Sequence, residues 1–338
     1  MPADLTWRIA FAPDTRNWRY PLPLSRELEW HANGILTAEV ALPSIPSGHI
    51  VVPSFASPDS PDHRWVLVSG DASHATAGFG RPGSQCDHAG GDEGLDVRVD
   101  YFETSRAMSN ARLRLLVDAA EPPRDYLAAI GVRPAQQATD LTPAETAILD
   151  IPARSQANAA PAELRPRICS PTCVSMAMEH LGVDHAFHEL VTAAYHRATD
   201  LYGVWPQNIW AASRWGVIGA IETAMDWNVV ERAVDGGHPL AASIAFGEGD
   251  LAGSAIPASD GHLVIVRGIQ NNRVVVNDPA ADDVARVPRH YDADEFRKAW
   301  LGARGACYLF AVPGSLRPGS ARVSLAENRS ARGDPSHI

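Results

Sequence analysis

Hydrophobic and polar positions alternate with a period of two along much of the first third of the chain. The alternating or short apolar segments are WRIAFA (7–12), ILTAEVAL (35–42), HIVVPSF (49–55), RWVLVSG (64–70), LDVRVDYFE (95–103) and ARLRLLVD (111–118). A period of two is the repeat of a β-strand, and Gly, Pro, Ser and Asp fill the gaps between the segments. Short strands at this spacing, without helices between them, predict an antiparallel β-sandwich over residues 1–120.

The pattern changes after residue 120. Residues 121–151 are rich in Ala and Pro, and they predict a linker in which DYLAAIG (125–131) forms one or two helical turns. Helical periodicity follows in PTCVSMAMEHLG, FHELVTAAYHRA, PQNIWAASRWG and ADEFRKAWL, and strand patterns follow at 239–246, 262–269, 273–278 and 306–312. Helices followed by strands predict an α+β domain over residues 152–313. The tail, residues 314–338, lacks apolar periodicity, so we expect it to be flexible.

Composition limits the partners of the chain. The 338 residues carry a formal net charge of -11, which argues against a nucleic-acid or anionic-membrane partner because both bind basic surfaces. No run of 18 apolar residues predicts a membrane span. The N-terminus lacks the basic and apolar regions of a secretory signal, so a cytoplasmic location is the default expectation, and a secreted one if a signal was trimmed. The oligomeric state is left open.

Four cysteines are too few and too scattered for a disulfide framework, and no CxxC pair predicts a zinc site. We therefore expect no metal and no cofactor. Two of the four, Cys169 and Cys173, stand four positions apart in ICSPTCVSMAMEHLG (168–182). Pro171 suits the first turn of a helix, and Gly182 suits its end.

The start of this helix separates the two thiols. Cys169 lies at the positive end of the helix dipole, where unpaired backbone N–H groups favour a thiolate. Cys173 lies one turn inside the helix, where a cysteine is normally a small packed residue. The sequence therefore favours Cys169 as a nucleophile over Cys173.

A cysteine nucleophile needs a base and a group that orients the base. In DGHLVIVRGIQNNRVVVNDPAA (260–281), His262 opens a strand, a turn near Gln270–Asn272 follows, and Asp278 closes the next strand. A hairpin that turns there places His262 and Asp278 at the same open end. Asp278 then accepts the imidazole N–H and fixes the tautomer of His262.

These residues resemble the papain-like cysteine peptidases, and within them the C39-like family. CSPTCVSM (169–176) is similar to the nucleophile motif of that family, GHLVIVRG (261–268) to its base motif and NDPAA (277–281) to its orienting Asp-Pro pair. GVWPQN (203–208) resembles a stretch found in a bacterial subgroup with an N-terminal β-domain. The resemblance covers residues 152–312 and implies a papain-like fold with Cys169 as nucleophile, His262 as base and Asp278 as orienting residue.

The resemblance also implies further site residues. The family uses a glutamine upstream of the cysteine as an oxyanion donor. Position 163, where one branch has it, is a glutamate, so Gln156 in PARSQ is assigned this role. The GVWPQN stretch is expected to border the cleft, with Trp205 and Asn208 as substrate-binding residues. The Gly-rich segment 246–261 runs into His262 and is expected to form a rim of the cleft.

The expected function is hydrolysis of peptide bonds through a thioester acyl-enzyme, with a peptide or protein as substrate. Three alternatives stay open at this point. A transferase or amidase would use the same three residues, and a binding protein would keep the fold without activity. The aromatic residues Trp18, Tyr20, Trp30 and Trp65 would stack on sugars if the first domain bound carbohydrate.

Overall fold

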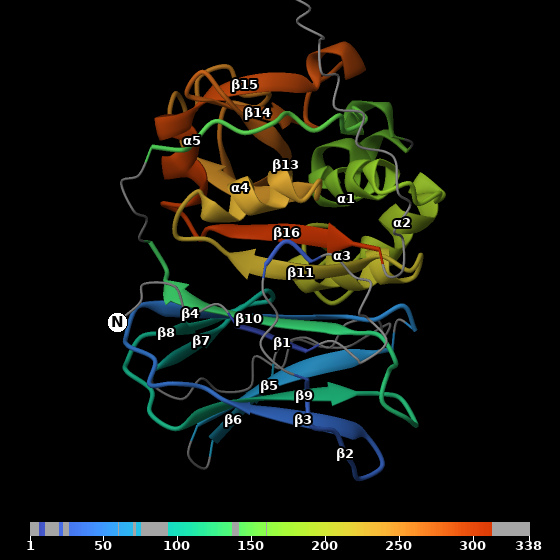
Figure 1. Ribbon diagram of the computed structural model, residues 1–338, viewed down its shortest axis with the longest axis vertical. Helices are drawn as coiled ribbons and strands as arrows, with labels where there is room; N and C mark the ends of the chain where they lie inside the picture. Colours follow the sequence, from blue (N-terminus) through green and yellow to red (C-terminus); the bar gives the residue numbers. More distant parts are fainter. Residues whose placement is uncertain are drawn as a thin grey trace, which may run out of the picture.

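The structure is a computed structural model that describes residues 7–10, 20–22, 27–59, 61–69, 72–75, 94–136, 142–159 and 161–312. The predicted flexible tail, Trp18 and Cys86 lie outside these residues. The described chain is a mixed α/β protein with antiparallel sheets. An N-terminal unit of two sheets lies below a C-terminal unit in which helices cover a third sheet (Figure 1).

The N-terminal unit contains two five-stranded antiparallel sheets, in the orders β1-β10-β4-β8-β7 and β2-β3-β9-β5-β6. All six segments with strand patterns form strands. The segment LDVRVDYFE forms two, because the chain turns back on itself at residues 98–101. The strands are β1 (Trp7–Ala10), β2 (His31–Ala32), β3 (Leu36–Ala41), β4 (His49–Ala56), β5 (His63–Ser69), β6 (Ala72–Ala75), β7 (Leu95–Val97), β8 (Phe102–Thr104), β9 (Ala111–Val117) and β10 (Leu127–Pro134).

Strands β4 and β10 pair with each other, and almost every residue of both is buried. Val51 and Ile130 belong to the core between the two N-terminal sheets, whereas Val52 and Ala129 belong to a core shared with the C-terminal unit. The sheet is thus covered on both faces, and such strands lose the alternation of polar and apolar residues. The helical turns predicted for DYLAAIG are therefore wrong. An apolar run without alternation cannot be told from a buried helix, and here it forms β10 inside the segment predicted as linker.

The C-terminal unit is built on a six-stranded antiparallel sheet of order β11-β16-β12-β13-β14-β15. The four predicted helices and four predicted strands are present, while β11, α4 and β15 were not predicted. The helices are η2 (Gln156–Asn158), η3 (Ala162–Arg167), α1 (Cys169–His180), α2 (Phe187–Ala194), α3 (Trp205–Ser213), α4 (Asn228–Asp235), η4 (Val284–Arg286) and α5 (Ala293–Trp300). The strands are β11 (Ile218–Thr223), β12 (Leu240–Phe246), β13 (Ser259–Gln270), β14 (Arg273–Asn277), β15 (Pro288–Asp292) and β16 (Ala306–Ala311).

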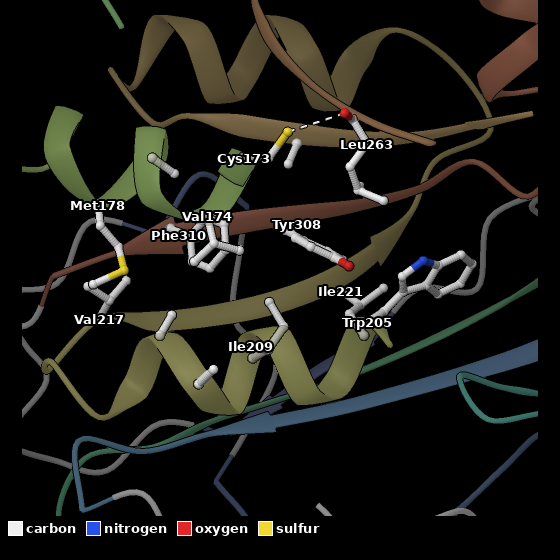
Figure 2. Packing of buried hydrophobic residues seen from close by; sticks show 14 of the residues in the cluster. Cys173, Val174, Met178, Trp205, Ile209, Val217, Ile221, Leu263, Tyr308 and Phe310 are labelled. Atoms are coloured by element: carbon white, nitrogen blue, oxygen red, sulfur yellow. Dashed lines mark hydrogen bonds between the residues drawn. The ribbon is translucent and has the colours of Figure 1, made fainter. Parts of the chain in front are cut away.

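Two hydrophobic cores lie on opposite faces of this sheet. Leu263 and Ile265 of β13 face α1, α2 and α3, whereas Val264 and Val266 face α4 and α5. In the first core, Met178 of α1 and Ile209 of α3 pack around the β16 side chains (Figure 2). The period of two along β13 thus assigns alternate residues to different cores and fixes which end of the strand faces α1.

The two units are joined by a buried arginine and by close backbone packing. Arg133 of β10 is fully buried, and its guanidinium donates to the carbonyl oxygens of Leu301, at 2.8 Å, and of Ala224. The backbone N–H of Ile221 in β11 donates to Ser54 Oγ in β4 at 2.9 Å. The C-terminal sheet therefore rests on the outer face of β4 and β10 (Figure 1).

The aromatic residues that were considered as sugar-stacking positions make internal contacts where the structure describes them. Trp65 is fully buried, Trp30 packs edge-on against Tyr126, and the hydroxyl of Tyr20 donates to Glu222. These contacts leave the three rings without an open face of the kind that stacks on a sugar.

Across the described part of the chain, no helix has both the length and the apolar character that crossing a bilayer requires.

Replacement of Arg133 by methionine tests the junction between the two units. It leaves two buried carbonyl oxygens without donors, and each unsatisfied buried acceptor costs about 1–3 kcal/mol. We expect Arg133→Met to lower the free energy of unfolding in urea by about 2–5 kcal/mol. Arg114→Met is the control, because Arg114 is 42% exposed and pairs with Glu39 on the surface. That change should cost about 1 kcal/mol or less, and equal effects of the two variants would contradict the role of Arg133.

Candidate active site

Cys169 is the first residue of α1, so the helix begins two residues earlier than predicted. The first backbone bond of the helix runs from the Thr172 N–H to the Ile168 carbonyl, which leaves the Cys169 N–H without an acceptor inside the helix. Cys169 is partly exposed, whereas Cys173 is fully buried one turn later. The predicted difference between the two thiols is confirmed in their exposure.

Leu263 of β13 contacts both sulfur atoms. Cys173 Sγ donates to the Leu263 carbonyl oxygen at 3.3 Å, which Figure 2 shows as a dashed line. The backbone N–H of the same residue bonds to the Cys169 thiolate and lowers its pKa. Burial, together with the negative charges of Cys169 and Asp278, raises the pKa of Cys173 well above its ordinary value. Cys173 is therefore a neutral packed residue.

The β13–β14 hairpin places the other two predicted residues. Its turn lies at Asn271 and Asn272, which have φ angles of 53° and 54°, and Gln270 pairs with Arg273. At the open end of the hairpin, His262 Nε2 lies 2.8 Å from Asp278 Oδ1. The side chains are 3% and 1% exposed. The prediction that the hairpin brings these two residues together is confirmed.

The electrostatics of the site favour a charged pair of cysteine and histidine. Burial acts against ionisation of Cys169, but the hydrogen bond and the charge of His262 outweigh it and lower the pKa of the thiol. Burial also acts against the imidazolium, but the Asp278 carboxylate and the Cys169 thiolate raise the pKa of His262 to about 10. Between the two pKa values, the favoured state is a thiolate beside an imidazolium.

Asp278 has more partners than sequence reasoning supplied. Its Oδ1 also accepts the Ala280 N–H at 2.9 Å, and its Oδ2 accepts the hydroxyl of Tyr291 at 2.6 Å. Burial alone would raise the pKa of Asp278, but the His262 charge and these hydrogen bonds lower it. Tyr291 was missed because it stands in PRHYD, a short strand without apolar alternation. Its place is fixed only by the pairing of β15 with β14.

An extended segment, residues 142–155, brings Gln156 to the site. This segment bonds to β13 beyond the point where β12 ends, through Thr146 N–H to Ile269 O at 3.0 Å and Leu149 N–H to Arg267 O at 2.8 Å. Gly268 leaves room for it, because a Cβ there would lie 2.2 Å from the Ala147 oxygen.

The end of this segment is held at the turn that follows Asp278. Ser155 Oγ donates to the Ala281 carbonyl, and the Gln156 N–H donates to the Pro279 carbonyl at 2.9 Å. Gln156 is 8% exposed, and its Oε1 has no hydrogen-bond partner. Glu163, at the position where one branch of the family has its glutamine, is exposed on η3. Of these two residues, Gln156 is the one held beside the Asp278 turn.

Trp205 and Asn208 make structural contacts inside the protein. Trp205 is 5% exposed, stacks on Tyr101 at 5.9 Å between ring centroids, and donates its backbone N–H to Asp100 Oδ1 at 2.6 Å. Asn208 is fully buried, and its Nδ2 donates to the carbonyls of Tyr202 and Val204, each at 2.8 Å. The structure thus gives neither side chain an exposed face toward a substrate, and their substrate-binding role stays a prediction.

Among the described residues, no three His, Cys, Asp or Glu side chains gather in the manner of metal ligands. The chemistry available at the site is that of a thiolate, an imidazolium, a carboxylate and hydrogen-bond donors.

Comparison with known proteins places this region in a family. The model of the Peptidase_C39 like family matches residues 148–308. These residues form a C39-like peptidase domain. No curated protein matches the chain.

Two solved structures resemble the chain. A protein from Bacillus anthracis assigned as a C39-like peptidase is 13% identical, with a TM-score of 0.38, and the match covers 49% of this chain and 98% of that one. A double glycine motif protease from an AMS/PCAT transporter, solved in complex with the leader peptide, is 14% identical, with a TM-score of 0.32. That match covers 52% of this chain and 98% of the protease.

The rate at which each cysteine of the C39-like domain is alkylated tests the charged pair. We expect iodoacetamide to modify Cys169 first, with an apparent pKa below the ordinary thiol value of ~8.5. In His262→Ala, burial dominates and the pKa rises, so the rate at pH 6.5 should fall by about 10-fold or more. Peptide mapping by mass spectrometry identifies the modified residue.

Cys173→Ser is the control for this experiment. It keeps a donor to the Leu263 carbonyl, so its alkylation profile should match that of the wild type. Modification of Cys173 before Cys169, or no cysteine reacting below about pH 8, would contradict the charged pair.

Proposed function

We propose that this protein is a cysteine peptidase that hydrolyses peptide bonds through Cys169, His262 and Asp278. The observation that carries the proposal is the hydrogen-bonded row of these three side chains at the start of α1 in a C39-like domain. A thiolate is the reactive form of cysteine, and the row favours this form near neutral pH.

In the first half of the reaction, the Cys169 thiolate attacks the carbonyl carbon of the scissile peptide bond. A C–S bond forms, and the carbonyl electron pair moves onto oxygen. His262 then gives its proton to the leaving nitrogen as the C–N bond breaks, and an amine departs. Because Nε2 is engaged by Asp278, the proton that moves is the one on Nδ1. The product that stays on the enzyme is a thioester.

Two donors are proposed for the oxyanion of the tetrahedral intermediate. The Cys169 backbone N–H has no acceptor within the helix, and the Nε2 group of Gln156 is the second donor. The anchoring of the Gln156 N–H on Pro279 supports this role, because it ties the glutamine to the turn that carries Asp278. Removal of one such donor typically lowers kcat by ~10²–10³.

In the second half, neutral His262 accepts a proton from water as the water oxygen attacks the thioester. The C–S bond breaks, the acid product leaves, and the proton returns the enzyme to the thiolate–imidazolium pair. Asp278 keeps the imidazole in one tautomer and stabilises its charge in both halves. No step requires a group that the chain itself does not supply.

For the N-terminal unit we propose a β-sandwich that supports the peptidase domain. The core common to its two sheets supports the sandwich, with Phe55 and Phe102 from one sheet and Trp65 and Leu113 from the other. The supporting role is proposed because β4 and β10 bury their outer faces against the C-terminal unit.

Cleavage of a mixed peptide library, read by mass spectrometry of new termini, tests the proposed activity. We expect the wild type and Cys173→Ser to release fragments, and Cys169→Ala to lose the activity by about 10⁴-fold or more. Cleavage by Cys169→Ala at the wild-type rate would contradict the proposal. Adducts with an added amine, in place of free acids, would instead identify a transferase. Labelling of Cys169 without any cleavage would identify a binding protein.

A further inference from the structure

The Asp278 carboxylate is held by three donors that come from three places in the C39-like domain. His262 Nε2 and the Ala280 N–H share Oδ1, at 2.8 Å and 2.9 Å, while the hydroxyl of Tyr291 is bonded to Oδ2 at 2.6 Å. The Tyr291 bond is the shortest of the three and joins two side chains that are each 1% exposed or less. No other donor to Oδ2 stands among the hydrogen bonds of the described residues.

The Tyr291 hydroxyl is itself oriented. The backbone of Ala255, in the loop between β12 and β13, hydrogen-bonds to the phenol oxygen. With that lone pair occupied, the hydroxyl proton points to Asp278. The ring is fixed as well, because Tyr291 pairs with Val274 in the sheet and stacks on Phe296 at 6.1 Å between centroids. Burial and the neighbouring carboxylate raise the pKa of Tyr291 above its ordinary value, so it remains a hydrogen-bond donor throughout the working pH range.

We propose that Tyr291 is a positioning residue of the site, which holds the plane of the Asp278 carboxylate so that Oδ1 faces His262. It acts on Cys169 through Asp278 and His262 and touches neither sulfur nor substrate. The proposal rests on the function proposed above and adds a fourth side chain to it.

The physical reason is the freedom of an aspartate side chain. A carboxylate turns readily about its terminal torsion, which is broad and twofold. Two donors on Oδ1 hold one oxygen, but a buried Oδ2 without a donor would carry an unsatisfied charge. Without the hydroxyl, the group turns toward other donors or becomes protonated, and in both cases the bond to His262 weakens. The imidazolium and the thiolate that depends on it are then less favoured.

The test is the pH profile of Cys169 alkylation in the full chain, with Tyr291→Phe against the wild type. The profile has an acid limb where the thiolate forms and an alkaline limb where the imidazolium is lost. A hydrogen bond to a charged group corresponds to ~1–2 pKa units. We expect Tyr291→Phe to raise the apparent pKa of the acid limb and lower that of the alkaline limb, which narrows the interval by about one unit.

Two further variants separate positioning from a structural role. Tyr126→Phe removes another buried tyrosine hydroxyl, which accepts the Leu28 N–H in the N-terminal unit, and should leave both limbs in place. Ala255→Pro removes the backbone donor that orients the Tyr291 hydroxyl while the tyrosine stays. It should narrow the interval in the same direction by a smaller amount, and it serves as the test if Tyr291→Phe does not fold.

The outcomes distinguish this proposal from the one it rests on. If the wild type shows no reactive thiolate, the proposed function fails. If the wild type shows the interval and Tyr291→Phe reproduces it, the function stands and the positioning role is overturned. A wider interval in Tyr291→Phe would also overturn it, because the hydroxyl would then act only by withdrawing charge from Asp278.

Discussion

The hydrogen bond between His262 and Asp278 is the interaction on which the rest of the site depends. Both side chains are almost completely buried, where a charge without a partner is costly and a charged pair is strong. The bond lowers the pKa of Asp278 and raises that of His262. Through His262 it reaches Cys169, whose own burial would otherwise favour the neutral thiol. One buried pair thus sets the protonation of the whole row.

The sheet explains how this pair is brought to the cysteine. His262 and Leu263 are consecutive residues of β13 near its entry, so one faces Asp278 and the next holds both sulfur atoms through its backbone. The strand can be this long because the segment 142–155 bonds to it where β12 ends. The N-terminal unit then covers the far side of the C-terminal unit, with Arg133 bound to backbone carbonyls of the C39-like domain. Binding elements and support are therefore parts of one packed structure.

Much of this arrangement is predictable from local sequence, because local signals fix it. The hairpin follows from the Asn271–Asn272 turn and the apolar runs on either side, and the helix end follows from Gly182, whose φ is 75°. What failed depends on contacts between distant residues. β10 was read as helix because its second face is buried by the other unit, and Tyr291 had no motif because only strand pairing brings it to Asp278. The contacts of Trp205 with Asp100 and Tyr101 depend on the position of the N-terminal unit in the same way.

The most direct test of the account is an NMR titration of the His262 ring nitrogens in the wild type and in Asp278→Asn. The account predicts that both nitrogens of the wild type are protonated at neutral pH and that the ring titrates near pH 10. In Asp278→Asn the titration should move down toward ~6.5, the ordinary value of a histidine. A wild-type ring that is already neutral at pH 7 would contradict the thiolate–imidazolium pair, and with it the mechanism built on Cys169.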